Sequence, residues 1–111
     1  TLQSKEYDLA IGSWYADVFD PSDFLEVFKD EAQATNSTGW ENADYKSLLD
    51  LSSIEMDQAT RRELLSQAQH ILIDEMPMIP IYHATFLHLE CGEIRGVSLS
   101  PMGHLDFVDA Q

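Results

Sequence analysis

The pattern of apolar residues predicts three helices, of which the one near the centre of the chain is the clearest. This helix is expected to begin after Asp57, a good N-cap residue, and to end near Glu75, because Pro77 disfavours helical structure at the residue before it. Apolar residues recur along it at helical spacing and form one stripe: Leu64, Leu65, Ala68, Ile71, Leu72 and Met76. The stripe predicts that one face of this helix packs into a hydrophobic core.

Two shorter helices are expected upstream. Asn42 is a good N-cap for the helix that directly precedes the long one. Its inward face is predicted to contain Tyr45, Leu48, Leu49 and Leu51. The other helix, at residues 21–29, would follow Asp20 as N-cap and Pro21 at the first helical position, with Asp23 adding negative charge near the positive helix end. Its predicted core face consists of Phe24, Leu25 and Phe28.

Extended structure is expected on both sides of these helices. Residues 6–12 alternate apolar and polar side chains, which is the period of a half-buried strand. A second strand is predicted at residues 78–82, where Pro80 has to occupy an edge or a bulge because it cannot donate to a ladder. Further extended segments are expected at residues 86–89, 93–98 and 105–108. Together these elements predict an α/β (α+β) fragment with three helices and a mixed sheet.

The turn between the first strand and the first helix carries the most informative side chains, Trp14, Tyr15 and Asp17. Ligand sites of α/β sheets lie at such strand ends, and aromatic rings with a polar group suit an amphipathic ligand. A tryptophan at a strand end can equally belong to the core. Asp17 also has two interpretations: it binds a cationic ligand group, or it accepts hydrogen bonds from nearby backbone N–H groups.

Composition narrows the classes of partner. The chain has 111 residues, 44% of them hydrophobic, as in a small globular domain. Its net charge of -14 argues against nucleic acid as a partner and disfavours an anionic membrane surface. No apolar run approaches the roughly 20 residues that span a bilayer. The chain opens on Thr1 without a signal peptide, so we expect a fragment or a processed piece of a longer protein.

Neither a metal site nor a catalytic pattern is predicted. The residues that invite a metal interpretation are His70, His83, His88, Cys91 and His104, and their spacing matches no typical ligand set. A single cysteine excludes an intrachain disulfide. The sequence contains no Ser-His-Asp arrangement, glycine-rich phosphate loop or nucleophile elbow. These observations favour a binding protein without metal or cofactor over an enzyme.

Five short motifs follow one another in an informative order. The first is Trp14-x-Ala16-Asp17-x-x-Asp20-Pro21-x-x-Phe24-Leu25. The others are Asn36-x-x-Gly39-Trp40-x-Asn42, Arg61-Arg62 at the start of the long helix, Pro77-Met78-Ile79-Pro80-Ile81-Tyr82 and Ile94-x-Gly96-Val97. This ordered set resembles the C-terminal region of the family-5 extracellular solute-binding proteins, the oligopeptide- and dipeptide-binding receptors of ABC importers. The resemblance covers essentially the whole chain.

The resemblance implies roles for four site residues. At the position of Asp17, peptide-binding members use an aspartate to hold the α-ammonium group of the ligand, which needs a paired carboxylate once water is excluded. The backbone around Trp14 and Tyr15 would pair with an extended peptide like an added strand. Asn36 matches an asparagine in a loop that borders the pocket, although a turn-forming asparagine is an equally good interpretation.

One departure from the family leaves the ligand open. The best-known oligopeptide receptors have an arginine a few residues before the tryptophan, and it helps to anchor the peptide carboxylate. The equivalent stretch here, Leu9-Ala10-Ile11, has no basic residue. A dipeptide, a nickel complex or haem are therefore alternative ligands on the same fold.

The resemblance also implies the fold and the partners. The chain would be part of a periplasmic-binding-protein type II two-lobe fold, with residues 1–85 in the C-terminal ligand-binding lobe. Residues 86–111 would form strands that return through the hinge toward the N-terminal lobe, and Tyr82 would pack near the crossover. The receptor would work outside the cytoplasmic membrane, in the periplasm or at the cell surface. Its partners would be a peptide ligand, the membrane permease of an ABC transporter and the N-terminal lobe missing from this chain.

A rival interpretation from another class is a small acidic protein-interaction module. It would recruit a basic partner through the helix at residues 57–76.

Overall fold

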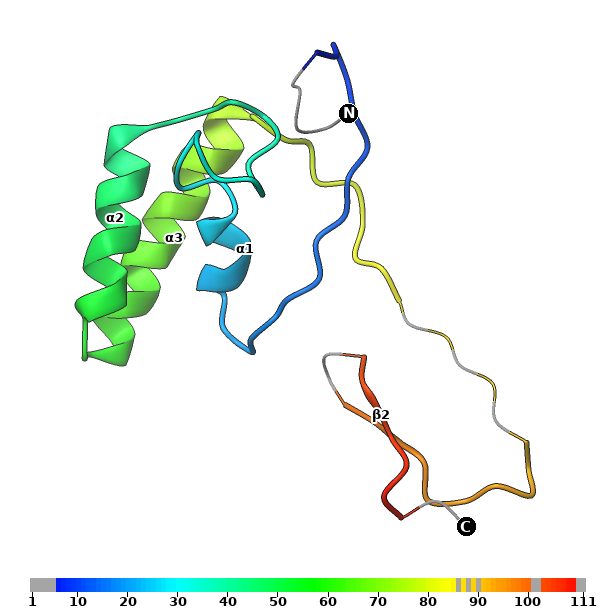
Figure 1. The fold of residues 1–111 in the computed structure, drawn as a ribbon. Coiled ribbons are helices and arrows are strands. Elements are labelled where there is room, and N and C mark those ends of the chain that lie inside the picture. The colour runs from blue at the N-terminus through cyan, green and yellow to red at the C-terminus, as the bar shows by residue number, and fades with distance from the viewer. Residues whose placement is uncertain (1–5, 86, 88, 90, 101–102, 110–111) are drawn as a thin grey trace.

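The computed structural model of the chain describes residues 6–85, 87, 89, 91–100 and 103–109. Within these residues the elements are α1 (Ser22–Glu26), α2 (Ala43–Ile54), α3 (Gln58–Glu75), β1 (Ser98–Leu99) and β2 (Leu105–Asp106). The helices form one unit, and the two strands form a hairpin that lies apart from it (Figure 1). No helix in the described ranges is long and apolar enough to cross a membrane.

The three helices share one hydrophobic core. α2 and α3 lie side by side, and α1 contacts both (Figure 1). The buried residues of this core are Leu25, Tyr45, Leu49, Leu65, Ala68 and Leu72. The hydroxyl of Tyr45 donates to the backbone carbonyl of Leu25 at 2.6 Å, which ties α2 to α1. Burial raises the pKa of Tyr45, so the phenol stays protonated and able to donate.

The predicted starts of α2 and α3 are confirmed. The side chain of Asn42 accepts the backbone N–H of Tyr45 at 3.0 Å, and that of Asp57 accepts the backbone N–H of Thr60 at 2.8 Å. α3 also ends where predicted, at Glu75. Met76 follows with a left-handed backbone (φ 49°), an uncommon conformation for a residue other than glycine that terminates the helix.

α1 is shorter than predicted, and one residue of its predicted core face is exposed. It has five residues, and Pro21 occupies the N-cap position that was expected for Asp20. Phe24, predicted to be in the core, is 49% exposed. The reason is that Leu25 is the residue whose side chain enters the core and whose carbonyl bonds Tyr45, which sets the rotation of so short a helix. Phe28 packs against the core as predicted.

The strands predicted at residues 6–12 and 78–82 are wrong for this structure. Both segments run as irregular chain (Figure 1). Most of their apolar residues, such as Ile11 and Ile81, are exposed, whereas Met78 packs against the helical core. A strand needs a neighbour for its backbone N–H and C=O groups, and no described residue supplies one. Tyr82 is 80% exposed, so the expected packing of this ring is also absent from the described structure.

The sheet is a short antiparallel hairpin instead of the expected mixed sheet. Ser98 lies opposite Asp106 and Leu99 opposite Leu105. The two strands overlap the segments predicted at residues 93–98 and 105–108, and the hairpin makes no contact with the helices within the described residues. The prediction at residues 86–89 falls partly on residues 86 and 88, which lie outside the described residues.

Candidate ligand-binding site

A carboxylate from α1 holds the turn that carries the predicted site. Oδ2 of Asp23 accepts the indole N–H of Trp14 at 3.0 Å and the backbone N–H of Asp17 at 3.1 Å. Hydrogen bonds to an ionised acceptor are stronger than those between neutral groups. Asp23 therefore fixes two points of residues 14–17, which we call the aromatic turn.

An ion pair fixes the start of α1 to α3. The two terminal nitrogens of Arg61 donate to the two carboxylate oxygens of Asp20 at 3.0 and 2.9 Å. Asp20 also accepts the backbone N–H of Ser22 at 2.9 Å and its hydroxyl at 2.6 Å. The hydrogen bonds from Arg61, followed by those from Ser22, hold the pKa of Asp20 well below its usual range. Since Nε of Arg61 donates to the carbonyl of Ser52, the same guanidinium reaches the C-terminal end of α2.

Three of the predicted site residues lie together on the aromatic turn. Trp14 is 39% exposed and Tyr15 is 52% exposed. Asp17 is exposed too, and its carboxylate makes no hydrogen bond or ion pair with the described residues; only its backbone N–H is engaged. A hollow of about 220 Å³ lies beside the turn and is lined by Trp14, Asp23, Glu26, Val27, Gln33 and Thr35. The turn can therefore offer a negative charge and two aromatic rings to a ligand.

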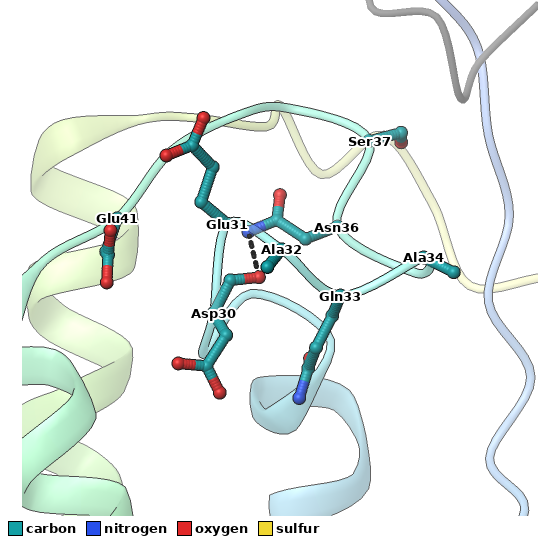
Figure 2. Close-up of a pocket in the computed structure, with 8 residues that line it drawn as sticks. All are labelled: Asp30, Glu31, Ala32, Gln33, Ala34, Asn36, Ser37 and Glu41. Carbon is teal, nitrogen blue, oxygen red and sulfur yellow. Dashed lines mark hydrogen bonds between the residues drawn. The ribbon is translucent and has the colours of Figure 1, made fainter.

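The fourth predicted residue, Asn36, lies in a different loop, and its side chain is fully engaged. Its Nδ2 donates to the carbonyls of Asp30 at 3.1 Å, the bond drawn in Figure 2, and of Trp40 at 2.9 Å. Its Oδ1 accepts the backbone N–H of Thr38 at 3.2 Å and the Thr38 hydroxyl at 2.8 Å. Two donated and two accepted bonds use the whole capacity of the amide. Asn36 thus organises its loop, and a contact between Asn36 and a ligand stays a prediction.

This loop borders an open hollow of about 570 Å³ (Figure 2). Its lining residues are Asp30, Glu31, Ala32, Gln33, Ala34, Asn36, Ser37 and Glu41. Asp30 forms an ion pair with Lys46 of α2. The hollow does not include Asp17, so it is separate from the aromatic turn.

The described residues contain no group of three or more His, Cys, Asp or Glu side chains that could hold a metal ion. His88, one of the residues considered for a metal, lies outside the described residues.

The acidic side chains of α3 bear on the rival interpretation, an interaction module. The carboxylate of Glu75 accepts the Trp40 indole N–H at 2.7 Å and the Asn42 amide at 2.6 Å. Glu63 accepts Gln67 at 3.0 Å. Because these two acids bond within the chain, no particular contact favours the acidic interaction module.

The roles of Asp23 and Arg61 were not predicted from the sequence. An acidic side chain in the first turn of a helix often reaches back to an N–H group that precedes the helix. This rule could have pointed from Asp23 to the aromatic turn. Arg61 lies 41 residues from Asp20, and no local signal connects the two.

Comparisons with known proteins relate the chain to peptide-binding proteins. The oligopeptide-binding protein OppA of Bacillus subtilis is 40% identical over 109 residues, which are 98% of this chain and 20% of that protein. The dipeptide-binding protein DppE of the same organism is 35% identical over 104 residues (94% of this chain, 19% of that protein). The peptide transport periplasmic protein SapA of Haemophilus influenzae is 28% identical over 108 residues (95% and 19%).

No family model matches the chain. The chain spans about a fifth of the length of these curated relatives. The similarity nevertheless runs through the aromatic turn, the loop of Asn36 and all three helices, because it covers nearly every residue.

Proposed function

We propose that this chain, which is similar to peptide-binding proteins over nearly its whole length, is part of a family-5 extracellular solute-binding protein and supplies one wall of its peptide-binding site. Asp17 pairs with the α-ammonium group of the peptide, and Trp14 and Tyr15 line the adjoining part of the ligand. The complete receptor works outside the cytoplasmic membrane, where it delivers peptides to the permease of an ABC importer. This role is binding and not catalysis.

Exposed apolar segments support the two-lobe fold. Leu9 and Ile11, which precede the helices in sequence, and Ile79 and Ile81, which follow them, are each at least two-thirds exposed. Exposed apolar surface of this kind marks a contact with another part of the protein. In the proposal, residues 1–85 belong to the C-terminal lobe of a type II periplasmic-binding-protein fold and residues 86–111 return toward the N-terminal lobe. The remaining four-fifths of the receptor covers these segments, and the lobes close on the ligand.

The observation that carries the proposal is the free carboxylate of Asp17 on an anchored turn. The carboxylate has no partner among the described residues, while the backbone N–H of the same residue is bonded to Asp23. An anchored carboxylate that is not used by the fold is available for a ligand cation. When the second lobe removes water, pairing with the ammonium group becomes strongly favourable, because an unpaired buried charge is costly.

The test is isothermal titration calorimetry on the complete receptor with trialanine and with N-acetyl-trialanine. Acetylation removes the positive charge, so we expect it to weaken binding about 100-fold or more, the effect of breaking a buried charge pair. Asp17→Asn is expected to weaken the binding of trialanine at least about tenfold and to leave the acetylated peptide nearly unaffected. Loss of the preference for the free amine is the signature of this role.

Asp74→Asn is the matched control. Asp74 is an exposed aspartate on α3 without a hydrogen bond or ion pair among the described residues, so this variant removes the same charge elsewhere. It is expected to bind trialanine like the wild type. Equal binding of trialanine by wild type and Asp17→Asn would exclude the proposed role. Dialanine, tetra-alanine, haem and a nickel chelate, titrated in parallel, identify the ligand class.

A further inference from the structure

Asp23 joins the candidate ligand residues to the rest of the fold. One of its carboxylate oxygens bonds both the indole of Trp14 and the backbone of Asp17. These two donors lie three residues apart on the aromatic turn. Residues 6–12, which precede the aromatic turn, pair with no strand among the described residues, so no sheet holds the turn from that side.

The position of Asp23 is itself defined by the core. Its backbone N–H donates to the carbonyl of Asp20 at 3.2 Å, and Asp20 is held by Arg61. Leu25, two residues later, is buried, and its carbonyl accepts the hydroxyl of Tyr45. The backbone of α1 is therefore fixed on both sides of Asp23. A path of hydrogen bonds runs from α3 through Asp20 and Asp23 to the aromatic turn.

We infer that Asp23 is a positioning residue for ligand binding, an inference that rests on the proposed function of Asp17. Asp23 acts through Trp14 and Asp17 and does not itself touch the peptide. Without its carboxylate, the aromatic turn samples conformations in which the indole and the Asp17 side chain no longer face the ligand together. The apparent dissociation constant then rises in inverse proportion to the fraction of molecules with the competent turn.

Two substitutions of Asp23 separate positioning from charge. Asp23→Ala removes the acceptor, and we expect it to weaken trialanine binding to the complete receptor about tenfold, as when the competent fraction falls to about one-tenth. Asp23→Asn keeps a carbonyl oxygen that can accept both N–H groups, although it loses the charge. We expect this variant to bind within about threefold of the wild type. Equal losses in both variants would overturn the inference, because positioning through the acceptor oxygen predicts that Asp23→Asn is largely spared.

A second readout needs no ligand. The indole N–H resonance of Trp14, assigned by its loss in Trp14→Phe, reports the bond to Asp23 in the NMR spectrum of the free receptor. Asp23→Ala is expected to move this resonance, Asp23→Asn to keep it near its wild-type position, and the matched control Asp74→Ala to leave it in place. An unmoved resonance in Asp23→Ala overturns the inference whatever the affinities are.

The outcomes for Asp17 and Asp23 remain distinguishable. If Asp17→Asn binds trialanine like the wild type, the proposed function fails. If Asp17→Asn loses affinity while Asp23→Ala binds normally, the proposed function stands and the positioning role is wrong. If both lose affinity, and the indole resonance moves only in Asp23→Ala, both are supported.

Discussion

Arg61 of α3 holds both carboxylate oxygens of Asp20, at 3.0 and 2.9 Å, across 41 residues of sequence. The planar guanidinium matches the carboxylate with two parallel hydrogen bonds, a geometry that lysine cannot reproduce. Asp20 also accepts the backbone N–H and the hydroxyl of Ser22, the first residue of α1. The ion pair between Asp20 and Arg61 therefore joins the start of α1 to α3. The join depends on a negative charge at Asp20, so acid is expected to weaken it.

Asp20→Asn is expected to reduce the acid sensitivity of the chain. The pKa of Asp20 is lower in the folded chain than the ordinary value of about 3.9, mainly because of Arg61. Its stabilisation is therefore complete well above pH 4 and is lost as the pH falls below that value toward the folded pKa. At pH 7 we expect the variant to be less stable by about 1 kcal/mol or less, a modest cost because the pair is partly solvated. Urea denaturation at pH 7 and pH 3, followed by circular dichroism, measures the difference, which should shrink at pH 3.

Asp74→Asn serves as the control for this experiment, since its carboxylate has no partner among the described residues. The free energy of unfolding of Asp74→Asn is expected to differ little from that of the wild type, and by the same amount at both pH values. If Asp20→Asn is destabilised relative to the wild type as much at pH 3 as at pH 7, the proposed role of the ion pair is contradicted.

Tyr45→Phe tests the hydrogen bond that ties α2 to α1. The Tyr45 side chain is fully buried, and the variant leaves the carbonyl of Leu25 without its donor. We expect a loss of about 1–2 kcal/mol in the free energy of unfolding. Tyr82→Phe removes an exposed hydroxyl and should change the stability by less than about 0.5 kcal/mol. Thermal and urea unfolding of the two variants give the comparison, and equal effects would argue against the buried bond.

Leu49→Ala tests whether α2 and α3 share the core described above. Leu49 is fully buried, so the truncation leaves a cavity and is expected to cost about 2–5 kcal/mol. Leu51, on the same helix, is 50% exposed, and Leu51→Ala should cost less than about 1 kcal/mol. If the urea midpoints of Leu49→Ala and Leu51→Ala are nearly equal, the face of α2 that packs in the core is assigned incorrectly.

Asn36→Ala distinguishes an asparagine that builds the loop from one that contacts the ligand. The variant loses four hydrogen bonds and exposes no new binding group, so we expect about 2–3 kcal/mol of destabilisation. Calorimetric denaturation of the complete receptor, followed by trialanine titration at a temperature where the variant is folded, separates the two roles. Weak binding with unchanged stability would assign Asn36 to the ligand.

The 111-residue chain by itself is expected to bind peptide weakly or not at all. It spans about a fifth of its relatives, and the aromatic turn is exposed, so the Asp17 carboxylate meets the peptide ammonium in water. A charge pair in that environment contributes only about 0–1 kcal/mol. Calorimetry of the chain with trialanine is expected to show no saturable heat up to millimolar concentrations. Tight binding by the chain alone would contradict the need for a second wall.

Local signals accounted for the two long helices. The caps Asn42 and Asp57 and the stop at Pro77 act within a few residues of themselves. The apolar pattern indicates most of the buried face, but Leu51 and Met76, which were predicted to lie on it, are about half exposed. α1 was less predictable, because a five-residue helix has little periodicity of its own and takes its rotation from the contact between Leu25 and Tyr45. The resemblance to peptide-binding receptors was confirmed by the relatives, which match nearly the whole chain.

The strands and the anchors of the site were not predictable in the same way. Residues 6–12 have the period of a strand, but pairing depends on a neighbour that the described chain does not provide. Trp14, Tyr15 and Asp17 stand together in one motif, so the sequence could point to them as candidates, and their contact with a ligand stays a prediction. Arg61 could not be assigned to the site from the sequence, because only the packing of α3 against α1 brings it to Asp20.

The side chain of Asp17 makes no hydrogen bond or ion pair within the described part of the chain, since the bond to Asp23 comes from its backbone N–H, which every residue except proline possesses. A substitution of this side chain is therefore expected to leave the helical core intact. Under the proposed function, ligand preference and folding stability could then evolve separately at this position.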